Sequence, residues 1–214
     1  MSAKRGLSRA HDSAIEDCGA YRANLLYGMK ATAFLGSPRP KGNTDILASR
    51  VLQGAEEAGH ATEVVALRRL KIKPCIGCDK CWRNEEPCVL QDDMCGLYQT
   101  IATSDVLVFA TPVYWYGPTA IMKAFIDRLV PFNRPQGRPL VEGKGAILVV
   151  ASEEEGPAAA EPLIRMFEMS FDYLGLRFLD RVIVDGVGPK GAVLRRPDAL
   201  ERAHQAGRAL ANRG

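Results

Sequence analysis

From residue 29 onward, short apolar runs alternate with longer segments in which apolar residues recur at helical spacing. The short runs predict strands, at residues 30–35, 61–67, 105–110, 144–151 and 177–184. The longer segments predict helices, at residues 45–58, 94–103, 119–129, 157–174 and 197–211. Because strands and helices alternate, we expect right-handed crossovers and an α/β fold: an open, doubly wound five-stranded parallel sheet.

Residues 1–28 do not continue this alternation. The segment is polar, its charged residues are scattered, and only residues 13–26 have helical character. We therefore assign residues 1–28 to an N-terminal extension outside the core and residues 29–214 to a single domain.

Composition narrows the possible partners. The chain has 214 residues and a net charge of +3, and no basic run is interleaved with aromatic residues, so nucleic acid is not an expected partner. No apolar run reaches membrane-spanning length and no secretory signal is evident, which predicts a cytoplasmic protein without a membrane partner. Six cysteines in such a chain favour metal or redox chemistry over a disulfide scaffold.

The stretch from Gly36 to Thr44 has the residue types of an anion-binding loop. It joins a predicted strand to a predicted helix, where free backbone N–H groups and the helix dipole attract a phosphate. Its glycines permit unusual backbone angles, and its side-chain donors are Ser37, Arg39, Asn43 and Thr44. The spacing matches neither a Walker A loop nor the G-x-G-x-x-G fingerprint. The alternative is a proline-rich turn capped by Asn43 or Thr44.

Five of the six cysteines lie in the long irregular segment 71–95, and such a loop in a compact domain is usually functional. Four of them are candidate ligands: Cys75, Cys78, Cys81 and Cys88, with two, two and six residues between them. The run is similar to that of a [4Fe–4S] ferredoxin with a longer last gap. A tetrahedral zinc site and a set of thiols, reduced or joined in a disulfide, are the open alternatives.

Three segments together resemble one family. They are Gly36-Ser-Pro-Arg-x-x-Gly-Asn-Thr44, Cys75-x-Gly-Cys78-x-x-Cys81 leading to Asp92-Asp-Met94, and Thr111-Pro-Val-Tyr114 followed by Lys123-x-Phe-x-Asp-Arg128. This set resembles the flavodoxin-like NAD(P)H-dependent FMN reductases and, within them, the iron–sulfur flavoproteins. The resemblance covers residues 30–128 well and the remainder in outline.

The resemblance implies an FMN site. The FMN phosphate would bind to Ser37, Arg39, Asn43 and Thr44. The isoalloxazine ring would rest on Pro112, Val113, Tyr114, Trp115, Tyr116 and Gly117, where backbone N–H groups favour the charge of the reduced flavin. Packing in the core or at a dimer interface is the alternative for Trp115. A third flavin loop would lie at residues 151–155, but its acidic run, Glu153 to Glu155, is typical of a solvated stretch.

The implied function is an NAD(P)H-dependent FMN reductase. NAD(P)H would be the co-substrate, and the electrons would pass through FMN to a small acceptor such as a quinone or a flavin. No catalytic protein side chain is expected, because the cofactor carries the redox chemistry. The alternative is an iron–sulfur flavoprotein that relays electrons between protein partners through FMN and a cluster at the four cysteines. A regulatory protein with a structural zinc is a third hypothesis. The resemblance also implies a homodimer or homotetramer.

Overall fold

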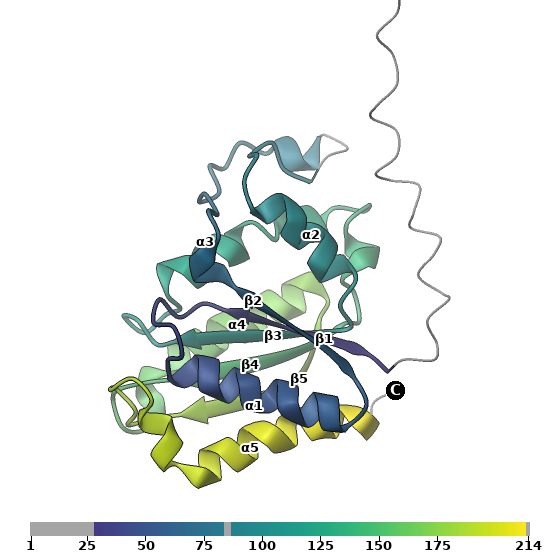
Figure 1. Ribbon diagram of the computed structural model, residues 1–214. Helices are drawn as coiled ribbons and strands as arrows, with labels where there is room; N and C mark the ends of the chain where they lie inside the picture. Colours follow the sequence, from purple (N-terminus) through teal and green to yellow (C-terminus); the bar gives the residue numbers. More distant parts are fainter. Residues whose placement is uncertain (1–27, 84–86, 213–214) are drawn as a thin grey trace, which may run out of the picture.

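A parallel five-stranded sheet forms the centre of the protein (Figure 1). The computed structural model describes residues 28–83 and 87–212, so the predicted extension and its helix lie outside the described residues apart from Gly28. The strands are β1 (Lys30–Leu35), β2 (Ala61–Ala66), β3 (Val106–Pro112), β4 (Gly145–Ala151) and β5 (Arg177–Val184). Their order is β2-β1-β3-β4-β5, which is the flavodoxin-like order and confirms the predicted fold class.

In residues 28–83 and 87–212, five α-helices connect and cover the strands. They are α1 (Asn43–Glu57), α2 (Met94–Ala102), α3 (Ala120–Asp127), α4 (Glu161–Leu174) and α5 (Pro197–Arg208). The predicted helix over 157–174 begins only at Glu161, after a 3₁₀ turn over Pro157–Ala159. Pro162 explains the later start, because a proline is tolerated in the first turn of a helix and not in its interior.

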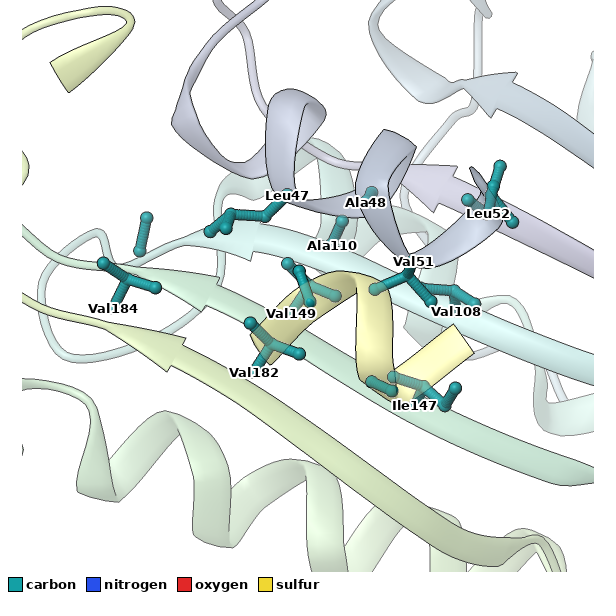
Figure 2. Packing of buried hydrophobic residues seen from close by; sticks show 14 of the residues in the cluster. Leu47, Ala48, Val51, Leu52, Val108, Ala110, Ile147, Val149, Val182 and Val184 are labelled. Atoms are coloured by element: carbon teal, nitrogen blue, oxygen red, sulfur yellow. The ribbon is translucent and has the colours of Figure 1, made fainter. Parts of the chain in front are cut away.

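The helices form two layers, with α1 and α5 on one face of the sheet and α2, α3 and α4 on the other (Figure 1). On the first face, Leu47 and Val51 of α1 pack onto aliphatic side chains of β3, β4 and β5 (Figure 2). The two helices of this face meet at glycines: a Cβ on Gly54 would lie 2.1 Å from the carbonyl oxygen of His204. The opposite core is aromatic, and the rings of Phe109 and Phe171 lie 5.0 Å apart.

The sheet reverses its direction of winding between β1 and β3, and this arrangement opens a crevice at their carboxyl ends. The base of that crevice is fixed by hydrogen bonds. The Gly36 N–H donates to the carbonyl of Ala110 at 2.8 Å. The Thr119 hydroxyl donates to the carbonyl of Gly36 at 2.6 Å and accepts the Met122 N–H, capping α3. Among the helices of the described ranges, none has both the length and the apolar character to cross a bilayer.

Candidate functional site

Loops from four strands line one cleft at the carboxyl edge of the sheet, with a cavity volume of about 80 Å³. Most of the flavin-site residues predicted from the sequence line it: Ser37, Arg39, Asn43, Thr44, Pro112, Val113 and Tyr114. The structure therefore brings together two segments that lie some seventy residues apart in the sequence.

The loop after β1 has the geometry of an anion cradle. Helix α1 begins with Gly42 at its N-cap position and has no side-chain cap, so the alternative of a turn capped by Asn43 or Thr44 is wrong. The first turn of a helix leaves its N–H groups without intrahelical partners, and these groups lie at the cleft. A Cβ on Gly42 would lie 3.0 Å from the carbonyl oxygen of Arg39 and 3.2 Å from the hydroxyl of Ser37. Only glycine fits this position without displacing the loop.

Asn43 holds a fourth loop against the cradle. Its side-chain amide donates to the carbonyls of Val187 and Pro189, and its carbonyl oxygen accepts the Val193 N–H at 3.2 Å. The Asn43 amide is thus already hydrogen-bonded within the protein, and its backbone N–H is the group left for an anion. Together these bonds fasten the loop after β5 over the cradle.

The loop after β5 contributes cationic and backbone groups that the sequence analysis missed. Arg39 donates through Nη1 to the carbonyl of Gly188 at 3.1 Å, and Lys190 also lines the cleft. The sequence feature that could have indicated these groups is Gly188-Pro-Lys-Gly191 after the last strand, because it has the glycines and the cation typical of an anion-binding loop.

A buried ion pair supports the cradle from below. Asp45 accepts the Lys41 N–H at 2.9 Å and pairs with Arg68 at 3.0 Å. Arg68 also donates to the carbonyl of Ser37 at 3.5 Å. Burial raises the pKa of Asp45, although the Arg68 guanidinium and the Lys41 N–H oppose that rise. Arg68 follows directly after β2, and no motif in the sequence marks it as part of this site.

An aromatic turn stands beside the cradle. Tyr114 and Gly117 exchange two backbone hydrogen bonds of 2.8 and 3.0 Å, and the turn between them holds Trp115 at φ 49° and Tyr116 at φ 60°. Left-handed backbone angles cost non-glycine residues about 1–2 kcal/mol each, and such strain is concentrated at functional sites. Trp115 is 95% exposed, so core packing is wrong as an interpretation of this residue.

A second cleft of about 300 Å³ adjoins the first and continues it past the aromatic turn. Trp115 and Tyr116 line it, and Val113, Ser152 and Glu153 line both clefts. Glu153, Glu154 and Glu155 are exposed as predicted. Glu153 also lines the cleft wall, beside a hydrogen bond that joins the loops after β4 and β5. The carbonyl of Ser152 accepts the Val187 N–H at 2.9 Å.

The four cysteines lie on the segment between β2 and α2, where Cys75 and Cys78 are exposed and Cys81 and Cys88 are partly buried. Burial raises the pKa of the Cys81 thiol, and the nearby Cys88, Cys75 and Cys78 raise it further. The other three thiols are thus within electrostatic reach of Cys81. In residues 28–83 and 87–212, however, no three Cys, His, Asp or Glu side chains converge as a metal site would require. The ligand role of the four cysteines stays a prediction.

A buried salt bridge anchors both ends of this cysteine segment. Arg128 Nη1 lies 2.8 Å from Asp92 Oδ2, and Nη2 lies 3.2 Å from Oδ1. Arg128 also donates to the carbonyls of Lys73 and Leu90, one before and one after the cysteines. Burial alone would raise the pKa of Asp92, but hydrogen bonds from Arg128 and from the N–H groups of Lys73 and Met94 outweigh it and lower that pKa.

Comparison with known proteins agrees with this arrangement of loops. The family model for NADPH-dependent FMN reductase matches residues 29–177, and the chain belongs to that family.

Two curated relatives differ in how much of their length is matched. An iron–sulfur flavoprotein of Archaeoglobus fulgidus is 41% identical over 125 residues, which are 58% of this chain and 55% of that protein. The chain thus spans about half the length of that relative. A putative NAD(P)H-dependent FMN-containing oxidoreductase, YwqN of Bacillus subtilis, is 31% identical over 179 residues, 82% of this chain and 94% of that protein.

Among solved structures, the Trp repressor binding protein of Bacillus subtilis is 28% identical with a TM-score of 0.62, and the match covers 83% of this chain and 98% of that one.

Proposed function

We propose that the protein is an FMN-dependent NAD(P)H oxidoreductase that reduces a small acceptor such as a quinone or a flavin. The observation that carries the proposal is the continuity of the cradle after β1 with the aromatic turn after β3 along one cleft wall. Membership of the NADPH-dependent FMN reductase family supports it. The flavodoxin-like fold alone does not identify the substrate, so the proposed substrate class rests on the residues of the two clefts.

The residues of the cleft fit the phosphate of FMN. Free N–H groups in the first turn of α1 would receive it, with the hydroxyls of Ser37 and Thr44 and the charges of Arg39 and Lys190 around them. A helix N-terminus with such donors is a general phosphate-binding arrangement. The ring would rest along Pro112 to Gly117, where Trp115 and Tyr116 stand exposed.

Bound FMN would supply the redox chemistry, accepting a hydride from NAD(P)H and passing two electrons on. The overall reaction is NAD(P)H, a proton and a quinone giving NAD(P)⁺ and a hydroquinone, which balances in atoms and electrons. The protein's contribution is to hold the phosphate end rigidly and to leave one side of the cleft open. The exposed second cleft is the part of the site where the nicotinamide and then the acceptor would enter.

An anaerobic titration tests the proposal. The purified protein, loaded with FMN, is titrated with NADPH and with NADH while the flavin absorption is recorded. We expect at least one nucleotide to bleach the flavin, and menadione to restore the oxidised spectrum. A flavin that stays oxidised with both nucleotides would contradict the function.

The cysteine segment favours a second candidate, electron transfer through an iron–sulfur cluster. The curated relative from Archaeoglobus fulgidus is named for such a cluster, and burial together with the other three thiols raises the pKa of Cys81. The four side chains do not converge as metal ligands in this structure. Iron and sulfide analysis of anaerobically purified protein, with a Cys78→Ser/Cys81→Ser variant as comparison, decides the question. Absence of both elements would exclude the cluster.

A further inference from the structure

The second cleft combines aromatic surface with negative charge. Its lining includes two exposed aromatic residues, Trp115 and Tyr116, and two acidic residues, Glu153 and Glu154. Within the described residues, the lining of this cleft includes no lysine or arginine. The cationic residues Arg39 and Lys190 line the neighbouring cradle instead. The two cations therefore lie at the cradle, whereas Glu153 lines both clefts and Glu154 lines the second cleft beside the aromatic turn.

The acidic wall is held in place by backbone bonds and is not a mobile strand of charges. Ser152 is 3% exposed, and its hydroxyl donates to the carbonyl of Glu154 at 3.1 Å. The Gly186 N–H donates to the same carbonyl at 3.3 Å. The side chain of Glu153 packs so close to Gly188 that an added Cβ there would lie 2.6 Å from its Cγ. Both residues thus stand on a fixed backbone and line the cleft that the aromatic turn borders.

We propose that Glu153 and Glu154 are specificity-determining residues that make the acceptor end of the cleft select planar aromatic acceptors carrying a positive charge. The proposal rests on the oxidoreductase function above and names its substrate class. The exposed rings offer a stacking surface and a cation–π partner. The carboxylates attract a cation and repel an anion of the same shape. An anionic quinone would be disfavoured at this end although the protein as a whole is positively charged.

Steady-state kinetics with matched quinones tests the selection. The acceptors are a naphthoquinone bearing a trimethylammonium side chain and a naphthoquinone sulfonate, and the measured quantity is the ratio of their kcat/KM values. Comparing this ratio between variants cancels the intrinsic reactivities of the two quinones. One exposed charge contact changes affinity by about two- to fivefold. Removing the two carboxylates should weaken binding of the cationic quinone and strengthen binding of the anionic one, so both changes lower the ratio. We expect the ratio to fall about tenfold in Glu153→Gln/Glu154→Gln.

The matched control removes the same charge elsewhere. Glu155→Gln/Glu201→Gln changes the net charge equally, but Glu155 packs against Gly186 and Glu201 lies on α5. Its ratio should stay within about twofold of the parent value. An unchanged ratio in the cleft variant, or an equal fall in the control, would overturn the proposal.

A binding measurement separates this proposal from the function on which it rests. The chain has two tryptophans, Trp82 and Trp115, so Trp82→Phe leaves Trp115 as the only indole. Methyl viologen, an aromatic dication, should quench its fluorescence at lower concentration than a zwitterionic sulfonatopropyl viologen does. That preference should disappear when Glu153→Gln/Glu154→Gln is added.

Two outcomes are then distinguishable. If neither nucleotide drives quinone reduction but the viologen preference is present and depends on the carboxylates, the proposed function fails and the charge selection stands. Equal quenching by the two viologens would refute the selection whatever the kinetics show.

Discussion

Replacing Asp92 with asparagine should destabilise the protein far more than the same change at a surface ion pair. The side chains of Arg128 and Asp92 are 1% and 3% exposed and meet through two hydrogen bonds. In Asp92→Asn the buried Arg128 guanidinium loses its counter-ion. The NH₂ group of the new amide would also replace a carboxylate oxygen that accepts hydrogen bonds, so that it faces other N–H donors. Leaving one partner of a buried pair uncompensated costs about 3–5 kcal/mol.

Asp127→Asn is the matched control, because Asp127 precedes Arg128 and pairs with Lys123 at 2.6 Å on the surface. Such exposed helical pairs contribute about 0.3–0.5 kcal/mol. Urea unfolding of the parent and both variants should therefore separate them by about 3 kcal/mol in the free energy of unfolding. Equal losses in the two variants would refute the view that Arg128 and Asp92 clamp the cysteine segment.

The same variants should differ in their pH dependence. The pKa of Asp92 is lowered in the folded protein, against about 3.9 in the unfolded chain. A depressed carboxyl pKa contributes stability that is present above the unfolded value and is lost as the pH falls through the folded value. The gap between the parent and Asp92→Asn should thus be constant from about pH 5 to 8 and should narrow below about pH 4. If the difference in the free energy of unfolding between the parent and Asp92→Asn grew below about pH 4, the charge of Asp92 would not be what stabilises the fold.

Three further changes have defined outcomes. Gly42→Ala should weaken FMN binding at least about tenfold, because its Cβ would crowd the cradle, whereas Gly96→Ala, in open space on α2, should leave FMN affinity unchanged in a fluorescence titration. Trp115→Gly should raise the free energy of unfolding by about 1 kcal/mol by relieving a positive φ, and a lower melting temperature would contradict the strain. Tyr98→Phe removes a 3.0 Å hydrogen bond to the carbonyl of Arg128 and should cost about 1 kcal/mol in urea unfolding. Burial raises the pKa of Tyr98, so the parent should lose stability above about pH 10 and the Phe variant should lose less.

The layered fold could be predicted from the sequence because its signals are local. The apolar run of β3 and the helical spacing of α1 follow from residues that are neighbours along the chain. The cradle after β1 was predictable for the same reason, since its glycines and donors stand side by side at a strand-to-helix junction. The main departures, the later start of α4 and the extension of β3 to Pro112, are boundary shifts at prolines.

What the sequence could not give is the pairing of distant loops. Nothing in the sequence around Asn43 indicates that its side-chain amide would hydrogen-bond to the loop after β5, some hundred and fifty residues later. Arg68 and Lys190 were missed because each is one cation among many until the fold places it beside the cradle. The charge run predicted that Glu153 is exposed, as it is, but its position beside Gly188 at the cleft wall follows only from the fold.

If the loop from Gly36 to Thr44 binds the phosphate of FMN, the protein should distinguish FMN from riboflavin, which lacks that phosphate. Equilibrium binding to the flavin-free protein, followed by flavin fluorescence, measures the affinity for each. Several charge-assisted hydrogen bonds to the phosphate predict that FMN binds one per chain and at least about a hundredfold more tightly than riboflavin. Equal affinity for the two flavins, or no binding of either, would contradict the account.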